Sequence, residues 1–214
     1  MANNITEMVF ILDRSGSMHG LEKDTIGGFN SMIDRQKQAE GPCYVTTVLF
    51  DDRYELVHNR IELSSLSPLT DEDYYTRGST ALLDAVGVTI VNVKSSLRHI
   101  REELRPDKVV FVITTDGLEN ASREYTYSAV RKLITEQKEA GWEFMFLGAN
   151  IDAVSEAQKF GIAKERAVRY KSDHIGTTLN FKTVGEALMS MRCAGAINED
   201  WAEAICEDTA ERGF

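Results

Sequence analysis

Three oxygen-bearing residues occur at every second position directly after an apolar segment near the start of the chain. Residues 8–12 (MVFIL) are of buried type, and the stretch DRSGS that follows contains Asp13, Ser15 and Ser17. Asp, Ser and Gly also favour simple turns, so this stretch alone leaves two interpretations open. One is an ordinary turn. The other is a loop that presents a carboxylate and two hydroxyls to a metal ion.

A second carboxylate and a third hydroxyl occur in two further segments. Asp116 follows the apolar run VVFVITT, and Thr80 precedes a long helical pattern in the segment TRGSTALLDAV. If both apolar runs are parallel strands, Asp13 and Asp116 leave the sheet at the same edge, where ligand sites of open α/β sheets form. The loop that contains Thr80 can then lie across that edge.

The combined set consists of two carboxylates and three hydroxyls: Asp13, Ser15, Ser17, Thr80 and Asp116. Hard oxygen donors of this kind favour Mg²⁺, with Mn²⁺ or Ca²⁺ as alternatives, over metals that prefer imidazole or thiolate. Two ionised carboxylates balance a divalent cation and no more, and the neutral hydroxyls leave it electron-poor. We therefore expect the bound cation to accept one further carboxylate, from an Asp or Glu residue of a partner protein.

The elements that would position these residues follow from the alternation of short apolar runs with stretches of helical period. This pattern is typical of a mainly parallel sheet covered by helices on both faces. The predicted strands are 8–12, 44–50, 108–115, 143–147 and 167–170, with a short antiparallel edge strand at 53–57. The edge strand forms a hairpin through Asp51 and Asp52, which we expect to be a solvated turn.

Helix boundaries are predicted from apolar spacing and from end signals. The clearest helix has apolar residues three or four positions apart from Val86 to Leu104 and is expected to end at Pro106. We expect a loop at 171–181, a helix at 183–192 and a last helix that starts at Asn198 as its N-cap. Residues 1–195 are predicted to form one domain, and residues 196–214 a C-terminal helical extension packed on it.

Charge and composition exclude several classes of protein. The net charge of −10 disfavours binding to nucleic acid or to an anionic membrane surface. No apolar segment approaches the roughly 20 residues of a membrane span, and the N-terminus lacks the order of a secretory signal, so we expect a cytoplasmic protein. Three cysteines without a C-x-x-C pair argue against a disulfide framework and against a zinc site. The oligomeric state stays open.

The motif segments resemble the metal-ion-dependent adhesion site (MIDAS) of von Willebrand factor type A (vWA) domains. The matching pieces are D-R-S-G-S, Gly78-Ser79-Thr80 and T-T-D-G, and the order of elements agrees over roughly residues 6–191. Many family members have a second Gly where this chain has Ser79. The resemblance implies a three-layer, Rossmann-like α/β fold in which Ser15 and Ser17 bind the metal directly. It also implies that Thr80 and the two Asp residues exchange direct for water-mediated coordination while a C-terminal helix moves.

Residues that flank the motifs are assigned smaller roles. Arg14 and Arg77 are expected to be charges at the rim of the site, and His19 an exposed loop residue. Asn120 is expected either to brace the loop after Asp116 or to cap a helix at the surface.

Two other classes of function compete with metal-dependent protein binding. A Mg²⁺-dependent phosphatase or phosphotransferase also has an Asp after its first strand, but haloacid-dehalogenase-type phosphatases have a second acid where this chain has Ser15. The chain contains no G-x-x-x-x-G-K-[ST], G-x-G-x-x-G or G-x-S-x-G motif, so we expect a protein that is not an enzyme. In the third class the metal is purely structural and another surface assembles with the partner.

Overall fold

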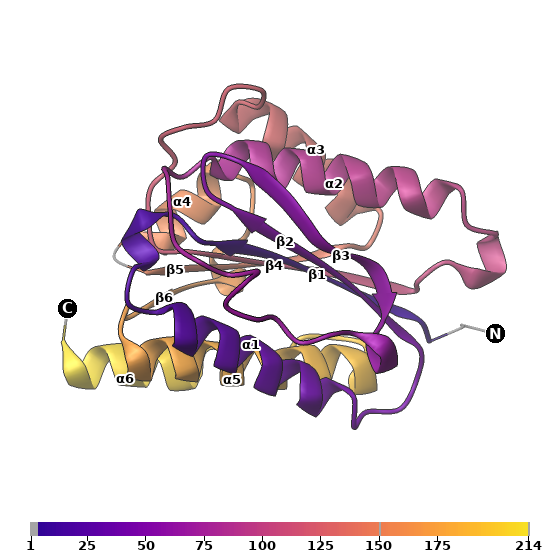
Figure 1. Ribbon diagram of the computed structural model, residues 1–214. Coiled ribbons are helices and arrows are strands. Elements are labelled where there is room, and N and C mark those ends of the chain that lie inside the picture. Colours follow the sequence, from indigo (N-terminus) through magenta and orange to yellow (C-terminus); the bar gives the residue numbers. More distant parts are fainter. Residues whose placement is uncertain (1–3, 150, 214) are drawn as a thin grey trace.

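Residues 4–149 and 151–213 are described by the structure, which is a computed structural model. Within this part of the chain, six strands form one sheet in the order β3-β2-β1-β4-β5-β6 (Figure 1). The strands are β1 (Thr6–Asp13), β2 (Cys43–Phe50), β3 (Tyr54–Glu62), β4 (Lys108–Thr115), β5 (Glu143–Ala149) and β6 (Ala167–Tyr170). All of them run parallel except β3, which pairs antiparallel with β2.

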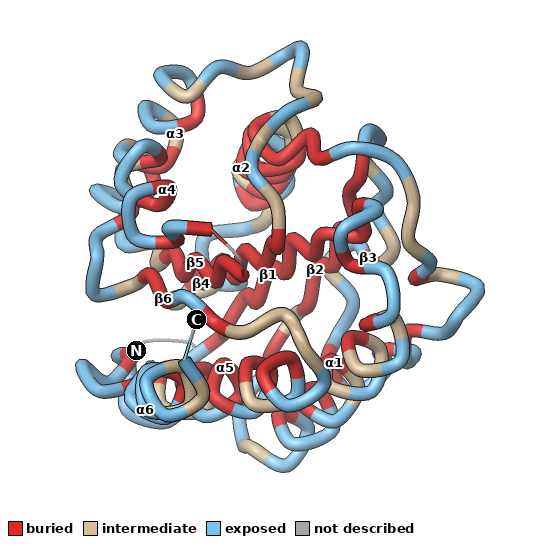
Figure 2. The backbone as a smooth tube through the Cα atoms, turned by 90° about the vertical axis from the view of Figure 1, so that its left-hand side faces the viewer, coloured by how far each residue is buried: buried red, intermediate tan, exposed pale blue. Residues whose placement is uncertain are grey.

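Helices cover both faces of the sheet, which gives the three layers of the predicted Rossmann-like α/β fold (Figure 2). One face is covered by α1 (Glu22–Gln36), α5 (His174–Ala194) and α6 (Glu203–Arg212). The other face is covered by α2 (Leu82–Arg98), α3 (Tyr127–Glu139) and α4 (Ala153–Lys159). None of the helices in the described ranges is long and apolar enough to cross a bilayer.

The central strand β1 is buried on both faces, which explains its continuous apolar sequence. Met8 and Phe10 join the core beneath α1 and α5, whereas Val9 and Ile11 join the core beneath α2, α3 and α4. Asp13 is the last residue of this strand and therefore emerges at the carboxyl edge of the sheet.

The edge strand β3 pairs antiparallel with β2, as predicted, but it is longer than residues 53–57. Its register shifts near Thr47 of β2, and Arg60 takes a left-handed conformation with φ of 50°. The Arg60 guanidinium lies 4.0 Å from the centroid of the Tyr44 ring, and its Nε lies 3.0 Å from Oε2 of the buried Glu7. Burial, opposed by Arg60, raises the pKa of Glu7 to about 7. A bulge of this kind lets the strand continue beyond the irregularity.

Two predicted helix boundaries are wrong. The helix α2 ends at Arg98 and not at Pro106, because the chain turns there and forms a short 3₁₀ helix at Glu102–Leu104 on the way to β4. Leu104, predicted to face the sheet, is 47% exposed. The helix α6 begins at Glu203 and not at Asn198, because the preceding turn places Trp201 in the core with its indole N–H on the Glu165 carbonyl.

The predicted loop at 171–181 is also wrong, because α5 already begins at His174. Its N-cap is Asp173, whose carboxylate accepts a hydrogen bond from the Gly176 N–H at 2.8 Å. The polar residues Thr177 and Asn180 are buried on the inward face of this helix. Polar residues at core positions conceal the apolar period that would have predicted the helix.

Adjacent glycines on α1 provide a test of how tightly α1 packs against α5. A Cβ added to Gly28 would lie 2.5 Å from Cδ2 and 3.1 Å from Cβ of Phe181, whereas one added to Gly27 would meet no atom within 4 Å. We predict that Gly28→Ala lowers the free energy of unfolding by about 1–3 kcal/mol through overpacking. Gly27→Ala should raise it by up to about 1 kcal/mol through helix propensity. Urea unfolding measures both, and equal effects would contradict the packing.

Candidate metal centre

The two predicted carboxylates lie at the carboxyl ends of adjacent parallel strands. β1 pairs with β4 in a register that places Leu12 opposite Thr114, so Asp13 and Asp116 leave the sheet side by side. Both are buried, with 1% and 4% of their surface exposed. The resulting position is the sheet edge at which open α/β folds bind their ligands.

Hydrogen bonds connect four of the five predicted ligands. The Ser17 hydroxyl donates to Oδ1 of Asp116 at 2.5 Å, and the hydroxyl oxygens of Ser15 and Ser17 are 3.1 Å apart. The Ser15 N–H donates to Oδ1 of Asp13 at 2.6 Å. Oδ2 of Asp13 accepts a hydrogen bond from the Thr115 hydroxyl, also at 2.6 Å. Sequence analysis missed Thr115, although its place at the end of an apolar strand was a usable signal.

The fifth residue, Thr80, lies against the same cluster. A Cβ added to Gly117 would stand 3.2 Å from Oγ1 of Thr80 and 3.5 Å from Oγ of Ser17. Only a glycine leaves this space between the two hydroxyls open. The structure therefore brings all five predicted residues together at one point of the sheet edge.

Asn120 holds the Thr80 backbone from the loop that follows Asp116. Its Oδ1 accepts a hydrogen bond from the Thr80 N–H at 2.9 Å, and its own N–H donates to the Thr80 carbonyl at 3.0 Å. The bracing interpretation of Asn120 is thus confirmed. The Gly78 carbonyl accepts a hydrogen bond from the Gly16 N–H at 3.2 Å, which joins the Thr80 loop to the Asp13 loop.

Two further acids fix the loop after β4, and sequence analysis did not give them this role. The Glu119 carboxylate accepts hydrogen bonds from the N–H groups of Leu83, Ala121 and Ser122 at 2.7–2.9 Å. The Asp84 carboxylate accepts three more, from the consecutive N–H groups of residues 123–125. These bonds tie the loop that follows Asp116 to the first turn of α2.

The electrostatics of the cluster favour the arrival of a cation. Burial raises the pKa of Asp13 to about 6, with hydrogen bonds from Thr115 and Ser15 opposing the shift. Burial also raises the pKa of Asp116, against the hydrogen bond from Ser17. Oδ2 of Asp116 is buried and has no hydrogen-bond partner among the described residues. A buried carboxylate oxygen without a partner is costly in the absence of a cation.

The donor set fits a hard divalent cation. Among the described residues, no group of three or more His, Cys, Asp or Glu side chains has the geometry of a metal site. The centre instead combines two carboxylates with three hydroxyls, and Ser17 is exposed at its opening. Oxygen ligands of this kind suit Mg²⁺ or Ca²⁺ better than Zn²⁺.

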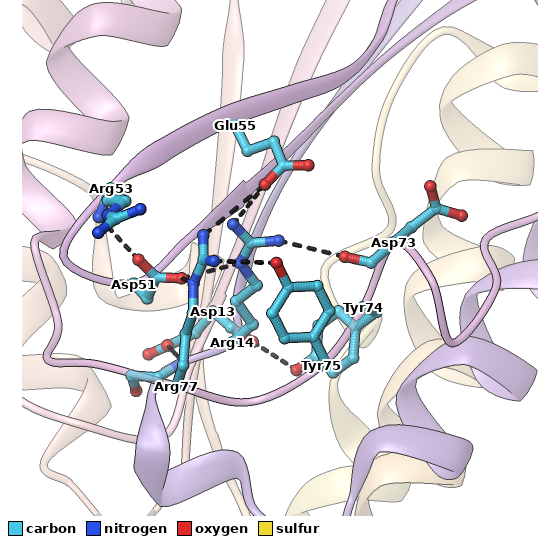
Figure 3. Close-up of polar contacts among 10 residues, drawn as sticks. Asp13, Arg14, Asp51, Arg53, Glu55, Asp73, Tyr74, Tyr75 and Arg77 are labelled. Atoms are coloured by element: carbon cyan, nitrogen blue, oxygen red, sulfur yellow. Dashed lines mark hydrogen bonds and ion pairs between the residues drawn. The ribbon is translucent and has the colours of Figure 1, made fainter.

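Arg14 is fully buried, so its predicted position at the rim is wrong. Figure 3 shows the polar contacts of its guanidinium group. Its Nε donates to Oδ2 of Asp51 at 2.9 Å and its Nη2 donates to Oε2 of Glu55 at 2.5 Å. Its Nη1 donates to the Asp73 carbonyl at 3.1 Å. The Asp13 loop is thereby anchored to the β2–β3 hairpin and to the segment that leads to Thr80.

Asp51 was predicted to be a solvated turn residue and is instead completely buried. Burial alone would raise the pKa of its carboxyl, but hydrogen bonds from Arg77 and the Arg53 N–H, together with the Arg14 charge, lower it. Arg77 is partly exposed, as expected, and its Nε donates to Oδ2 of Asp51 at 2.7 Å. Two guanidinium groups thus share one buried carboxylate oxygen.

Solved structures with the same arrangement of elements identify the fold. A vWA structure from Catenulispora acidiphila is 13% identical, with a TM-score of 0.55 over 88% of this chain and 43% of its own. The vWF domain of the type V pili tip protein Mfa5 from Porphyromonas gingivalis is 9% identical, with a TM-score of 0.57 over 86% of this chain and 94% of its own. This chain has the vWA fold.

A third solved structure with the vWA fold holds a metal. Proximal thread matrix protein 1 (PTMP1) from the mussel byssus, in a structure with a zinc-occupied MIDAS motif, is 15% identical, with a TM-score of 0.57 over 86% of this chain. The chain spans about half the length of PTMP1, 46% in that structure. No protein-family model matches the sequence, and no curated protein matches it.

The raised pKa of Asp13 predicts that metal binding depends on pH. Binding requires the ionised carboxyl, so a cation must displace a proton below pH 6 and meets an ionised group above it. We expect the Mg²⁺ affinity to fall about tenfold per pH unit below pH 6. Calorimetric titrations at pH 5, 6 and 7.5 measure this change. Asp13→Asn is the control, with no Mg²⁺ binding at any pH, and an affinity that is constant from pH 7.5 to 5 would contradict the assignment.

The two arginines on Asp51 should differ in their contribution to stability. Arg14→Gln removes a fully buried charge, so we expect a loss of about 3 kcal/mol in the free energy of unfolding. Arg77→Gln removes a cation that is 32% exposed in its side chain, and the loss should be below about 1 kcal/mol. Urea unfolding of both variants checks the order, and an equal or reversed order would count against the buried anchor.

Proposed function

We propose that the centre binds a divalent cation, with Mg²⁺ as the favoured ion, and uses it to capture an Asp or Glu side chain of a partner protein. The ligands are Asp13, Ser15, Ser17, Thr80 and Asp116. The observation that carries the proposal is their convergence at the carboxyl edge of the sheet, where Oδ2 of the buried Asp116 has no partner among the described residues. The zinc-occupied MIDAS of PTMP1, which has the same fold, supports a divalent metal at this position.

The protein groups prepare the site for an acidic ligand. The Thr115 hydroxyl and the Ser15 N–H orient both oxygens of Asp13, and Asn120 fixes the backbone of Thr80. A bound cation supplies a Lewis-acidic position for a further carboxylate, because two carboxylates and three neutral hydroxyls leave it electron-poor. Ser17, the exposed member of the set, lies where that ligand would enter.

The arrangement supports binding more than catalysis. The hydroxyl of Ser17 contacts Asp116 and Ser15, which are both assigned to the cation. Among the described residues, no histidine hydrogen-bonds to the hydroxyl of Ser15, Ser17 or Thr80. A nucleophilic hydroxyl requires an adjacent base, and the proposed ligand set offers none that is free of the metal.

Partner capture should depend on both the cation and Asp116. We predict that a pull-down from native cells recovers a protein with the wild type in Mg²⁺, and that EDTA or Asp116→Asn removes it. A partner retained in EDTA by a folded protein would show that the metal is structural and would contradict capture. Phosphate release from generic phosphoesters, abolished by the same substitution, would support an enzyme instead.

A further inference from the structure

Three exposed apolar side chains belong to segments that lead to or from the candidate metal centre. Ile175 and Leu118 are 57% and 55% exposed, more than the other large hydrophobic residues for which exposure is described, and Tyr75 is 43% exposed. Leu118 follows Asp116 by two residues, Tyr75 lies in the segment that leads to Thr80, and Ile175 is in the first turn of α5. We call these three residues the apolar rim.

The rim residues come from both sides of the sheet edge. The loop that contains Leu118 leads from β4 towards α3, whereas β6 leads into α5, which lies on the opposite face (Figure 2). β6 runs parallel to β5 and β4 and ends at Tyr170, so the short segment that leads into α5 leaves the sheet at the same carboxyl edge as Asp116. The first turn of α5 therefore lies at the same edge of the sheet as the metal ligands.

The backbone on either side of Leu118 is fixed, so its exposure is built into the loop. Gly117 leaves the space between the hydroxyls of Thr80 and Ser17. Glu119 and Asn120 are bound to the first turn of α2 and to Thr80. Leu118 is therefore held at the surface, where a ligand that covers it would gain apolar contact.

The other two rim residues are also held in place. The Asp173 cap fixes the first turn of α5, and a Cβ on Gly176 would lie 2.1 Å from the Lys171 carbonyl oxygen, so the turn is packed tightly beside Ile175. The Tyr75 ring lies 5.3 and 5.1 Å from the guanidinium carbons of Arg14 and Arg77, and its hydroxyl accepts a hydrogen bond from Arg77 at 2.9 Å (Figure 3). A rigid aromatic side chain provides contact area at a low cost in conformational entropy.

We infer that the apolar rim selects a partner segment in which a single Asp or Glu is flanked on both sides by bulky apolar residues. This inference rests on the proposed function, because the carboxylate must first reach the cation. The central cation attracts one carboxylate, and preorganised apolar side chains around it favour apolar neighbours. The net charge of −10 disfavours further acids in the same segment. The occupant is therefore an apolar peptide segment with one acid, in preference to a polyacidic one.

Short peptides test the inference through methyl NMR titrations in Mg²⁺. We expect acetyl-Leu-Asp-Leu-amide to bind about tenfold more tightly than acetyl-Ser-Asp-Ser-amide, because partial burial of leucine-sized side chains has an effect of this size. The methyl signals of Leu118 and Ile175 should shift with the first peptide. Acetyl-Leu-Asn-Leu-amide, which lacks the carboxylate, should not bind.

Rim variants and a matched exposed leucine provide the controls. The double variant Leu118→Ser, Ile175→Ser should lose the preference for the apolar peptide, and Leu104→Ser should keep it, since Leu104 is 47% exposed at the opposite end of the sheet. A Mg²⁺ thermal shift for each variant separates a lost preference from lost metal binding.

The outcomes distinguish this inference from the proposed function. Equal, Mg²⁺-dependent binding of the two Asp peptides would contradict selection by the apolar rim and leave carboxylate capture unaffected. An unchanged preference in the double variant would do the same. If acetyl-Leu-Asn-Leu-amide binds as tightly as acetyl-Leu-Asp-Leu-amide, the carboxylate does not contribute to binding, and the inference that the rim acts together with the cation is contradicted. If neither Asp peptide binds in Mg²⁺, carboxylate capture is contradicted and the inference falls with it.

Discussion

Two carboxylates on neighbouring parallel strands cannot both stay buried and ionised without a compensating positive charge. Asp13 and Asp116 are in this position because the register of β1 and β4 brings them out at one point of the sheet edge. The residues in contact with them are hydroxyls and N–H groups, which ease the repulsion but do not neutralise it. The protein thus keeps an electrostatic imbalance that a cation can correct.

The guanidinium of Arg14 does not correct this imbalance, although Arg14 follows Asp13 directly in the sequence. Its side chain is committed to Asp51, Glu55 and the Asp73 carbonyl on the other side of the loop. A cationic side chain turned towards Asp13 would have formed an internal ion pair and removed the need for a metal. Arg14 instead anchors the loop that follows β1 through its ion pairs with Asp51 and Glu55. The carboxylates of Asp13 and Asp116 are thereby left available to a cation.

Sequence reasoning predicted the parts of the structure in which local pattern and tertiary position agree. The strand β4 and the convergence of the five oxygen donors follow from continuous apolar runs that end in polar residues, and β6 has the predicted bounds 167–170 although Arg169 interrupts its apolar sequence. The first half of α5 was missed because Thr177 and Asn180 occupy inward positions, and burial of polar residues is decided by neighbours distant in the sequence. The burial of Arg14 and Asp51 was missed for the same reason, since each depends on a partner more than 25 residues away.

The borders of the sheet also constrain how the molecule can recruit another chain. On one border, the irregularity of β3 at Arg60 interrupts the regular row of backbone groups that an incoming strand would need. On the other border, β6 is only four residues long and lies against α4 and α6. Pairing of a strand from another molecule is disfavoured at both borders, and so is the edge-to-edge pairing of sheets that builds fibrils. Contact with other molecules is thereby directed away from the backbone and towards the loops.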